Sequence, residues 1–473
     1  MKNIIVLFKT HLDIGFTDFS ETVVRSYVEN FIPKALELAK QLRGRDQRFI
    51  WTTGSWHGLP CTTHTEIMTP ELFRYGLSIS KKLDERFGIH TIGAKMTDVP
   101  GHTRAILPLM AEAGIRFLHI GVNPASSVPV VPSLFRWQDE EGHELIVMYN
   151  GAYGTYTEIP GTDTAVCFDH TNDNLVPQNA EAVAQVYEEL TREHPDAHIY
   201  AGTLNDVAEA ALRATGLPAV TGEIGDSWIH GPGCDPEKVR QYRHLLRLCR
   251  DLPREQAEPV YRELLVPEHT WGPDEKVHLG DWWHTFSGEH RYFIRSEFEA
   301  ARPTERFRKM EQSWQEQRDY VRRGAAAYET ITGKPGLLPA PAFPDLTGWE
   351  EVSGPVPLGD YTLAFSDTGA VCRLEKNGRV LTDEAHPLGQ LLYETFSAED
   401  VRRFKEDYLI AKEDWTMEDF GKIGMEKAGV ESAICRPVLE KLLKMGSRLL
   451  PVPPAFLRLT LHFPGGCGIF YVL

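Results

Sequence analysis

A histidine and an aspartate one residue apart follow the first apolar segment of the chain, which begins MKNIIVLFKTHLDIG. Residues 3–8 (NIIVLF) are typical of a buried strand, and His11 and Asp13 come shortly after them. In an extended segment, residues two apart point to the same side, so both side chains can contact one cation. The pattern leaves two interpretations: half of a metal site, or a polar cap on a strand or loop.

Three further stretches place acids and histidines after predicted strands or in glycine-punctuated loops. They are MTDVPGHT with Asp98 and His102, GEIGDSWIHG with Glu223, Asp226 and His230, and PEHTWG with His269. Two histidines and two carboxylates form a plausible four-ligand set for Zn²⁺ or another divalent ion. Ligands collected from separate strand ends are typical of a catalytic site.

Other polar and aromatic residues are candidate substrate contacts. His64 and Glu66, in TTHTEIM, either contact substrate or are ordinary residues at a helix start. Trp228 and Trp271 either stack on sugar faces or pack against the core. The seven cysteines form no CxxC pair, which argues against a zinc–thiolate site or a disulfide framework, so we expect a cytoplasmic protein.

The elements that must position these residues alternate between strand and helix over the first 230 or so residues. The patterns predict strands at 3–8, 48–53, 90–96, 117–120, 145–150 and 198–201, and helices at 20–42, 70–88, 103–115, 179–193 and 205–214. This alternation predicts an α/β fold: a parallel sheet or barrel with helices outside. In such folds, sites gather at the carboxyl ends of the strands.

The pattern changes twice along the chain, which predicts three domains. Residues 1–234 form the β/α domain, and the mostly helical pattern at 235–331 predicts a helical bundle. A proline-rich linker follows, and then residues 345–473 form a β-rich region without an obvious domain closure. Within it, residues 360–381 alternate around an Asn-Gly turn and predict hairpins.

Composition excludes several classes of partner. The 473 residues carry a net charge of -17, which argues against nucleic acid or an anionic membrane surface as a partner. No stretch of about 18 apolar residues predicts a membrane span. The start of the chain is not typical of a signal peptide.

Several motifs together resemble a known family. HLDIGFTD followed by TDVPGHTRAILPLMAEAGI is similar to glycoside hydrolase family 38, the α-mannosidases. TTHTEIM, LDERFG, MTDVPGHT and EHTWG more closely resemble an uncharacterised bacterial branch, domain of unknown function 5054. The resemblance covers roughly residues 3–300.

The family resemblance implies a seven-stranded β/α barrel, a helical bundle and β-sandwich domains. It implies one Zn²⁺ ion and retaining hydrolysis of α-mannosides. The residues that match the family pattern are His11 and Asp13 as metal ligands, Asp98 as both ligand and nucleophile, and Asp226 as acid/base. For the last ligand, His269 is the first choice and His284, in WWHTFSGEH, the second.

We therefore expect a metal-dependent retaining glycoside hydrolase that acts on α-mannoside-type or related glycans. Two alternatives remain: a metal-dependent carbohydrate deacetylase, and a non-catalytic glycan-binding barrel protein. The chain also departs from the family pattern. The segment after Trp56 is short and the C-terminal region is too short for full sandwich domains, so the ligands could persist in a chain without activity.

Overall fold

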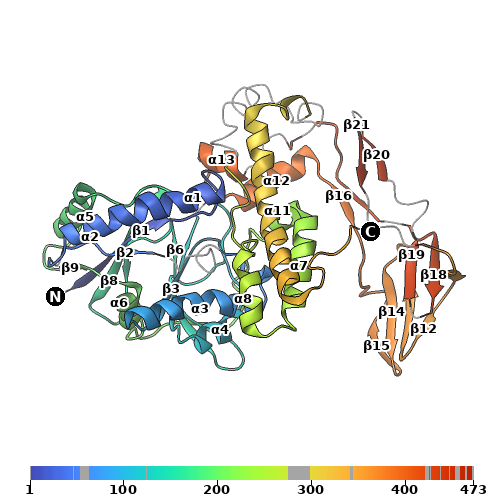
Figure 1. Ribbon diagram of the computed structural model, residues 1–473, viewed down its shortest axis with the longest axis horizontal. Coiled ribbons are helices and arrows are strands. Elements are labelled where there is room, and N and C mark those ends of the chain that lie inside the picture. Colours follow the sequence, from blue (N-terminus) through green and yellow to red (C-terminus); the bar gives the residue numbers. More distant parts are fainter. Residues whose placement is uncertain are drawn as a thin grey trace. The chain divides into compact units, whose positions relative to one another are not determined.

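The computed structural model describes residues 2–470 except 46, 54–62, 124, 275–298, 341–344, 421–424, 427, 437, 447, 453–458 and 464–465. The chain forms two compact units, drawn in Figure 1. The first comprises Met1–Leu338 and Phe404–Gly424, and the second Pro339–Arg403 and Met425–Leu473. The predicted boundary at residue 234 lies inside the first unit, so the division into three domains stays a prediction. No helix in the described part is long and apolar enough to cross a membrane.

The first sheet is built around β1 (Asn3–His11), the strand that ends at the predicted metal ligand His11. Its partners are parallel to it: β2 (Trp51–Thr52), β8 (Thr164–Asp173) and β9 (His198–Ala201). The short β7 (Thr157–Glu158) pairs with β8 in the antiparallel sense. The polar stretch in β8 carries no clear alternation, and the sequence patterns above do not predict a strand there.

The second sheet has the order β10-β5-β6-β4-β3. Its strands are β3 (Gly93–Asp98), β4 (Phe117–Val122), β5 (Leu134–Gln138), β6 (Glu144–Gly151) and β10 (Ala219–Val220). β3, β4 and β6 are parallel, whereas β5 is antiparallel to β6. The predicted α/β class is confirmed, with the correction that both sheets are mixed.

A closed seven-stranded barrel is not observed in the described residues. There β2 pairs only with β1, and β3 pairs only with β4. A cavity of about 400 Å³, lined by residues of β2, β3 and helix α3 (Pro70–Phe87), borders both strands. One hydrophobic core nevertheless joins the two sheets, because Leu7 of β1, Phe117 of β4 and Met148 of β6 belong to the same buried cluster.

The helices of this region closely follow the sequence patterns. They are α1 (Ser20–Ser26), a π-helical turn (Tyr27–Phe31), α2 (Ile32–Gln41), α3 (Pro70–Phe87), α4 (Ile106–Glu112), α5 (Ala180–Glu193) and α6 (Leu204–Ala211). α3 shows why: the side chain of Thr69 accepts a hydrogen bond from Leu72 N, and Gly88 ends the helix with φ 65°. Short 3₁₀ turns occur at Thr65–Ile67 and Gly231–Cys234.

Three long helices lie in the described part of residues 235–331, for which a helical bundle was predicted, and the bundle as a domain of its own stays a prediction. α7 (Pro236–Cys249), α8 (Arg254–Glu263) and the long α11 (Glu305–Thr332) pack side by side (Figure 1). Their core includes Tyr242, Val260 and Val321, and it extends to Leu72 and Tyr75 of α3. The helices are therefore continuous with the β/α region rather than separate from it.

The second unit is built of small antiparallel sheets. A four-stranded sheet contains β12 (Val356–Leu358), β13 (Tyr361–Phe365), β14 (Val371–Lys376) and β15 (Arg379–Thr382). Asn377 and Gly378 have φ of 49° and 79°, which confirms the predicted hairpin turn. The other strands are β11 (Glu350–Val352), β16 (Tyr393–Thr395), β17 (Ala433–Cys435), β18 (Lys441–Met445), β19 (Arg448–Val452), β20 (Leu459–Phe463) and β21 (Gly466–Phe470). Helix α12 (Ala398–Tyr408) runs from this unit into the first, to which α13 (Asp414–Phe420) belongs.

Candidate metal centre

Four residues from three parts of the chain meet at the ends of β1 and β3. His11 is the last residue of β1, Asp98 is the last residue of β3, and Asp13 follows β1 by two positions. His269 lies in the segment after α8, which is fixed by a β-bridge between Thr63 and Glu268. One ligand atom from each of the four residues lies within 4.8 Å of the others, so the cluster could hold a metal ion.

Local backbone features aim these side chains at one another. The register of β1 against β8 shifts between Thr10 and His11, and a bulge of this kind re-aims the side chain that follows it. Asn174, directly after β8, holds Asp13 by two hydrogen bonds, one donated by Asp13 N and one accepted by Asp13 O. Tyr27 donates a hydrogen bond to the carbonyl oxygen of His11. The loop that carries Asp13 is therefore fixed from β8.

Both histidines turn Nε2 toward the carboxylates. His11 Nε2 lies 2.9 Å from Asp13 Oδ1 and 3.0 Å from Asp98 Oδ2. His269 Nε2 lies 2.9 Å from Asp98 Oδ2 and 3.5 Å from Asp13 Oδ1. Ligand atoms about 2.0–2.1 Å from a tetrahedral Zn²⁺ are about 3.3 Å apart, so these separations suit a single ion.

Unsatisfied polar atoms give an independent test of whether a metal fits. His11 and Asp13 are 0% and 1% exposed. Asp13 Oδ1 and Asp98 Oδ1 are buried and accept no hydrogen bond of normal geometry from the described residues, although Asp13 Oδ1 lies 2.9 Å from His11 Nε2. Buried carboxylate oxygens without such hydrogen bonds are costly, and a cation at this point would remove that cost. The set of two nitrogens and two oxygens fits a divalent metal ion.

The charges in the cluster are strongly coupled. Burial by itself lowers the pKa of His11, but Asp13 and Asp98 raise it to about 9. Burial by itself raises the pKa of Asp98, but His11 and His269 bring it far below its ordinary value. The cluster therefore keeps Asp98 ionised even without a metal ion.

Asp98 has an unusual backbone conformation, with φ of 73°. This left-handed region is sparsely populated by residues other than glycine, although aspartate tolerates it better than most. Such a conformation persists only where the surroundings impose it, and it is frequent at functional sites. Here the residue with this conformation is the last residue of β3, and its side chain contacts both histidines.

Glu268 orients His269 and was missed by the sequence reasoning. Its Oε1 lies 2.9 Å from His269 Nδ1, and its Oε2 accepts hydrogen bonds from the backbone amide and the hydroxyl of Thr270. A carboxylate on the second ring nitrogen is the usual partner of a metal-ligating histidine. The signal in the sequence was the dipeptide Glu268-His269 itself.

A second cluster contains three of the other predicted site residues. His64 Nδ1 lies 2.5 Å from Asp226 Oδ2, and the backbone amide of Trp228 donates to Asp226 Oδ1. Burial and the charge of Asp226 raise the pKa of Glu66 to about 7. His64 is linked to the metal cluster through the segment after α8, because its backbone amide donates to Pro267 O.

The two tryptophans lie beside these clusters. The Trp228 ring stacks at 6.1 Å from the ring of His269, and its indole N–H donates to Ser126. The Trp271 ring lies 5.6 Å from the ring of His64. His102 is fully buried, hydrogen-bonded to Ile224 O through its backbone, and near Thr65. The contacts of Trp228 and Trp271 with substrate stay predictions.

Two further residues lie against the cluster. Tyr153, in the turn after β6, stacks on His11, and a tyrosine between glycines after a predicted strand was the only sequence signal for it. Asp173 Oδ1 lies 4.0 Å from His11 Nε2, and burial and Asp13 raise its pKa to about 6. His284, the second choice for the last ligand, lies outside the described residues.

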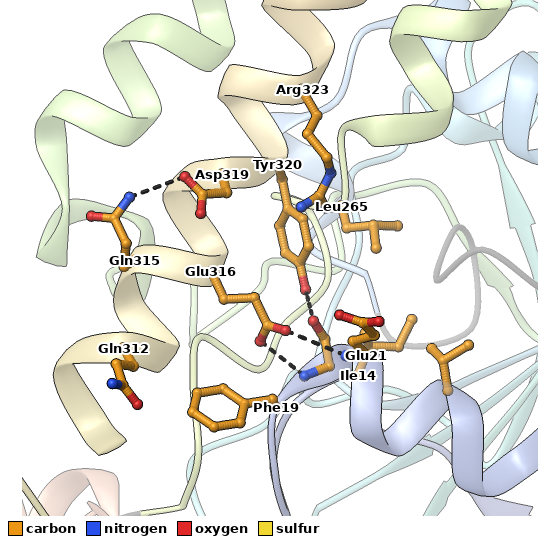
Figure 2. A pocket seen from close by; sticks show the side chains of 12 residues that line it. Ile14, Phe19, Glu21, Leu265, Gln312, Gln315, Glu316, Asp319, Tyr320 and Arg323 are labelled. Carbon is orange, nitrogen blue, oxygen red and sulfur yellow. Dashed lines mark hydrogen bonds between the residues drawn. The ribbon is translucent and has the colours of Figure 1, made fainter. Parts of the chain in front are cut away.

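A separate cavity of about 530 Å³ is lined by Ile14 and by residues of α1 and α11, and none of the four cluster residues lines it. Figure 2 shows that Glu316 of α11 points at the start of α1, where its carboxylate accepts hydrogen bonds from Ser20 N and Glu21 N. Tyr320 donates to Ser20 Oγ. A carboxylate at a helix N-terminus is stabilising, so these contacts of α11 hold the start of α1 beside the cavity.

Comparisons with known proteins find only limited similarity. A family model described as a domain of unknown function (DUF5054) matches residues 233–447, which include His269 but not His11, Asp13 or Asp98. No curated protein matches the chain.

Two solved structures are similar at low identity. An α-mannosidase from Enterococcus faecalis V583 is 12% identical with a TM-score of 0.45, covering 70% of this chain and 43% of that chain. A 4-α-glucanotransferase from Thermococcus litoralis is 11% identical with a TM-score of 0.34, covering 78% of this chain and 65% of that chain. The chain thus spans less than two thirds of the length of either protein.

Proposed function

We propose that the protein is a metal-dependent retaining glycoside hydrolase that acts on α-mannoside-type or related glycans, with one Zn²⁺ ion. The observation that carries the proposal is the buried cluster of His11, Asp13, Asp98 and His269, with its buried carboxylate oxygens. The motif resemblance to the α-mannosidase family supports the same residues. These four side chains would hold the ion, which as a Lewis acid would polarise a sugar hydroxyl.

Asp98 is the proposed nucleophile. A retaining enzyme needs one ionised carboxylate to attack the anomeric carbon and form a covalent glycosyl-enzyme. The neighbouring His11 and His269 keep the pKa of Asp98 far below its ordinary value, against the opposing effect of burial. Both histidines contact Asp98 through Oδ2, which leaves Oδ1 as the oxygen that would attack.

Asp226 is the proposed acid/base residue. In the first step it would protonate the leaving oxygen, and in the second it would take a proton from the attacking water. Its Oδ2 lies 2.5 Å from His64 Nδ1, so His64 would help to hold its carboxyl group in place. Glu66, whose pKa is raised to about 7, places a further carboxyl group beside Asp226. His64, Glu66, Trp228 and Trp271 are the proposed substrate contacts.

Elemental analysis of the purified protein, followed by assays on aryl glycosides with and without chelator, tests the proposal. We expect one equivalent of zinc, hydrolysis that the chelator abolishes, and loss of turnover in Asp98→Asn with the fold retained by circular dichroism. An unchanged rate in Asp98→Asn would contradict its role as nucleophile.

Two other outcomes would replace this proposal. Release of acetate from acetylated sugars without glycosidic cleavage would identify a carbohydrate deacetylase. Saturable sugar binding without hydrolysis, unaffected by Asp226→Asn, would identify a glycan-binding protein.

A further inference from the structure

The two histidines of the metal centre are held in different ways. His269 has Glu268 at its Nδ1, the usual arrangement for a metal ligand. His11 is fully buried, and its Nδ1 has no hydrogen-bond partner among the described residues. The contact of Tyr27 with His11 reaches only the backbone carbonyl, so it does not fix the ring. The contacts of Nε2 with the two aspartates hold only one edge of the ring, so a side chain that packs on its face would help to fix the plane.

The ring of Tyr153 lies against that of His11. The two centroids are 4.9 Å apart and the planes differ by 23°. Tyr153 is itself held edge-on by the ring of His170, at 5.2 Å and 87°. Stacking on one face restricts rotation of His11 about the bond that would turn Nε2 away from the carboxylates.

The turn that carries Tyr153 is strained. Ala152, Tyr153 and Gly154 have φ of 50°, 63° and 120°, so three consecutive residues lie at positive φ. Side chains other than glycine rarely adopt this conformation, and it persists only where surrounding contacts impose it. The contacts that hold this turn are therefore part of how Tyr153 reaches His11.

Buried polar groups of the second sheet hold the turn. Lys95 Nζ donates to the carbonyl oxygen of Tyr153 at 2.8 Å and lies 2.5 Å from His119 Nδ1. His119 Nε2 lies 3.0 Å from Asn150 Oδ1. Burial and the Lys95 charge lower the pKa of His119 well below its ordinary value, so the neutral ring accepts from Lys95 and donates to Asn150.

Close packing adds to this hold. A Cβ on Gly121 of β4 would lie 2.5 Å from the carbonyl oxygen of Tyr153, so the turn lies directly against that strand. The amide of Tyr153 also donates to Val122 O. Lysine is almost never fully buried without a specific partner, and the partners of Lys95 include the turn and His119.

We propose that Tyr153 is a positioning residue of the metal centre: its ring sets the plane of His11, and Lys95 with His119 holds the strained turn that carries it. The inference rests on the metal site of the proposed function. It assigns a role in metal binding to residues that would not themselves contact the ion.

The test compares Tyr153→Leu, which removes the ring, with Tyr153→Phe, which keeps it. Tyr156→Leu is the matched control, because Tyr156 stacks on His194 at 4.9 Å, a similar ring pair outside the cluster. Zinc affinity is measured by competition with a chromophoric chelator, and ligand geometry by the visible spectrum of the cobalt-substituted protein. We expect Tyr153→Leu to bind zinc roughly 10- to 100-fold more weakly and to change the cobalt spectrum, as for loss of other orienting groups.

Tyr156→Leu should keep the wild-type affinity and spectrum, and Tyr153→Phe, which loses only the hydroxyl that interacts with Asp98, should lose much less affinity than Tyr153→Leu. A Tyr153→Leu protein with both unchanged would overturn the inference while leaving the proposed function intact. An equal loss in Tyr153→Phe would assign the effect to the hydroxyl and would also overturn it. Absence of zinc from the wild-type protein would instead remove the proposed function.

Lys95→Met removes the hydrogen bond that holds the turn and leaves Tyr153 unchanged. It provides an alternative test if Tyr153→Leu does not fold. We expect weaker zinc binding and the same change in the cobalt spectrum. A folded Lys95→Met protein with wild-type affinity and spectrum would overturn the role of Lys95.

Discussion

Glu268 Oε1 lies 2.9 Å from Nδ1 of His269, its neighbour in the sequence, and neither side chain is more than 6% exposed. Adjacent residues seldom pair in this way in a regular element, where their side chains diverge. Here they lie in an irregular segment held by the bridge to Thr63. The pair fixes which nitrogen of His269 carries the proton and leaves Nε2 free for the cluster.

Glu268→Gln should weaken metal binding while the four ligands remain. An amide oxygen is a weaker acceptor than a carboxylate, so His269 becomes a poorer ligand, and we expect a loss of about 10- to 100-fold in zinc affinity. Competition with a chromophoric chelator measures it. Glu263→Gln is the control, because Glu263 forms a surface pair with Arg323 and should leave zinc affinity unchanged. Equal affinities in both variants would contradict the orienting role of Glu268.

The stability of the metal-free protein should fall as pH rises from about 6.5 to 9. Burial lowers the pKa of His11, but Asp13 and Asp98 raise it to about 9, above the unfolded value of about 6.5. A raised pKa contributes stability that is fully present below the unfolded value and is lost as pH rises through the folded value. Thermal unfolding at several pH values, with chelator present, measures this slope, the change in stability per pH unit.

Two comparisons identify the source of this pH dependence. His11→Gln should show a smaller slope, with His269 still contributing in the same direction. Saturating zinc should remove the slope, because a coordinated histidine is neutral across this range. If His11→Gln has the wild-type slope, other groups cause the effect.

The strand-end residues could be predicted because local pattern determines them. The apolar run of β1 and the strand before Asp98 are strong signals, and parallel strands bring their carboxyl ends together. The four predicted ligands accordingly lie within reach of one ion. Their role as ligands remains part of the proposal.

Other features depend on contacts that only the folded chain creates. β8 is a strand because it pairs with the whole length of β1, although its polar residues 169–173 gave no alternation. The buried Lys95 and His119 depend on contacts with each other, with the Tyr153 carbonyl and with Asn150, which no local pattern reveals. The antiparallel β5 likewise follows from a hairpin with β6 that the sequence patterns missed.

The two tryptophans proposed as substrate contacts should respond differently to substitution. The Trp271 ring has the ammonium of Lys238 at 5.0 Å, and a Cβ on Gly231 would lie 2.8 Å from its Cζ3. Trp228 instead stacks on His269 beside the cluster. We expect both Trp228→Ala and Trp271→Ala to raise KM, and Trp271→Ala in addition to lower stability by about 1–3 kcal/mol. Steady-state kinetics and thermal unfolding of both variants check this, and an unchanged KM in Trp271→Ala would contradict its contact with substrate.

Gly101 is expected to be essential for bringing Asp98 and Asp226 together. Their loops meet here: a Cβ on Gly101 would lie 2.1 Å from Gly225 O and 2.4 Å from Ile224 O. His102 N also donates to Ile224 O at 2.5 Å. Since these atoms belong to the backbone, Gly101→Ala must push the loops apart, at a cost of about 1–3 kcal/mol or more.

Gly222→Ala is the matched control, because a Cβ there meets nothing within 4 Å. We expect Gly101→Ala to lower the unfolding temperature by several degrees and to reduce turnover more than zinc affinity, since it displaces the Asp226 loop relative to Asp98. Gly222→Ala should match the wild type in all three measurements. If Gly101→Ala keeps full turnover, the close approach of these loops is not needed for the proposed pairing of the nucleophile with the acid/base residue.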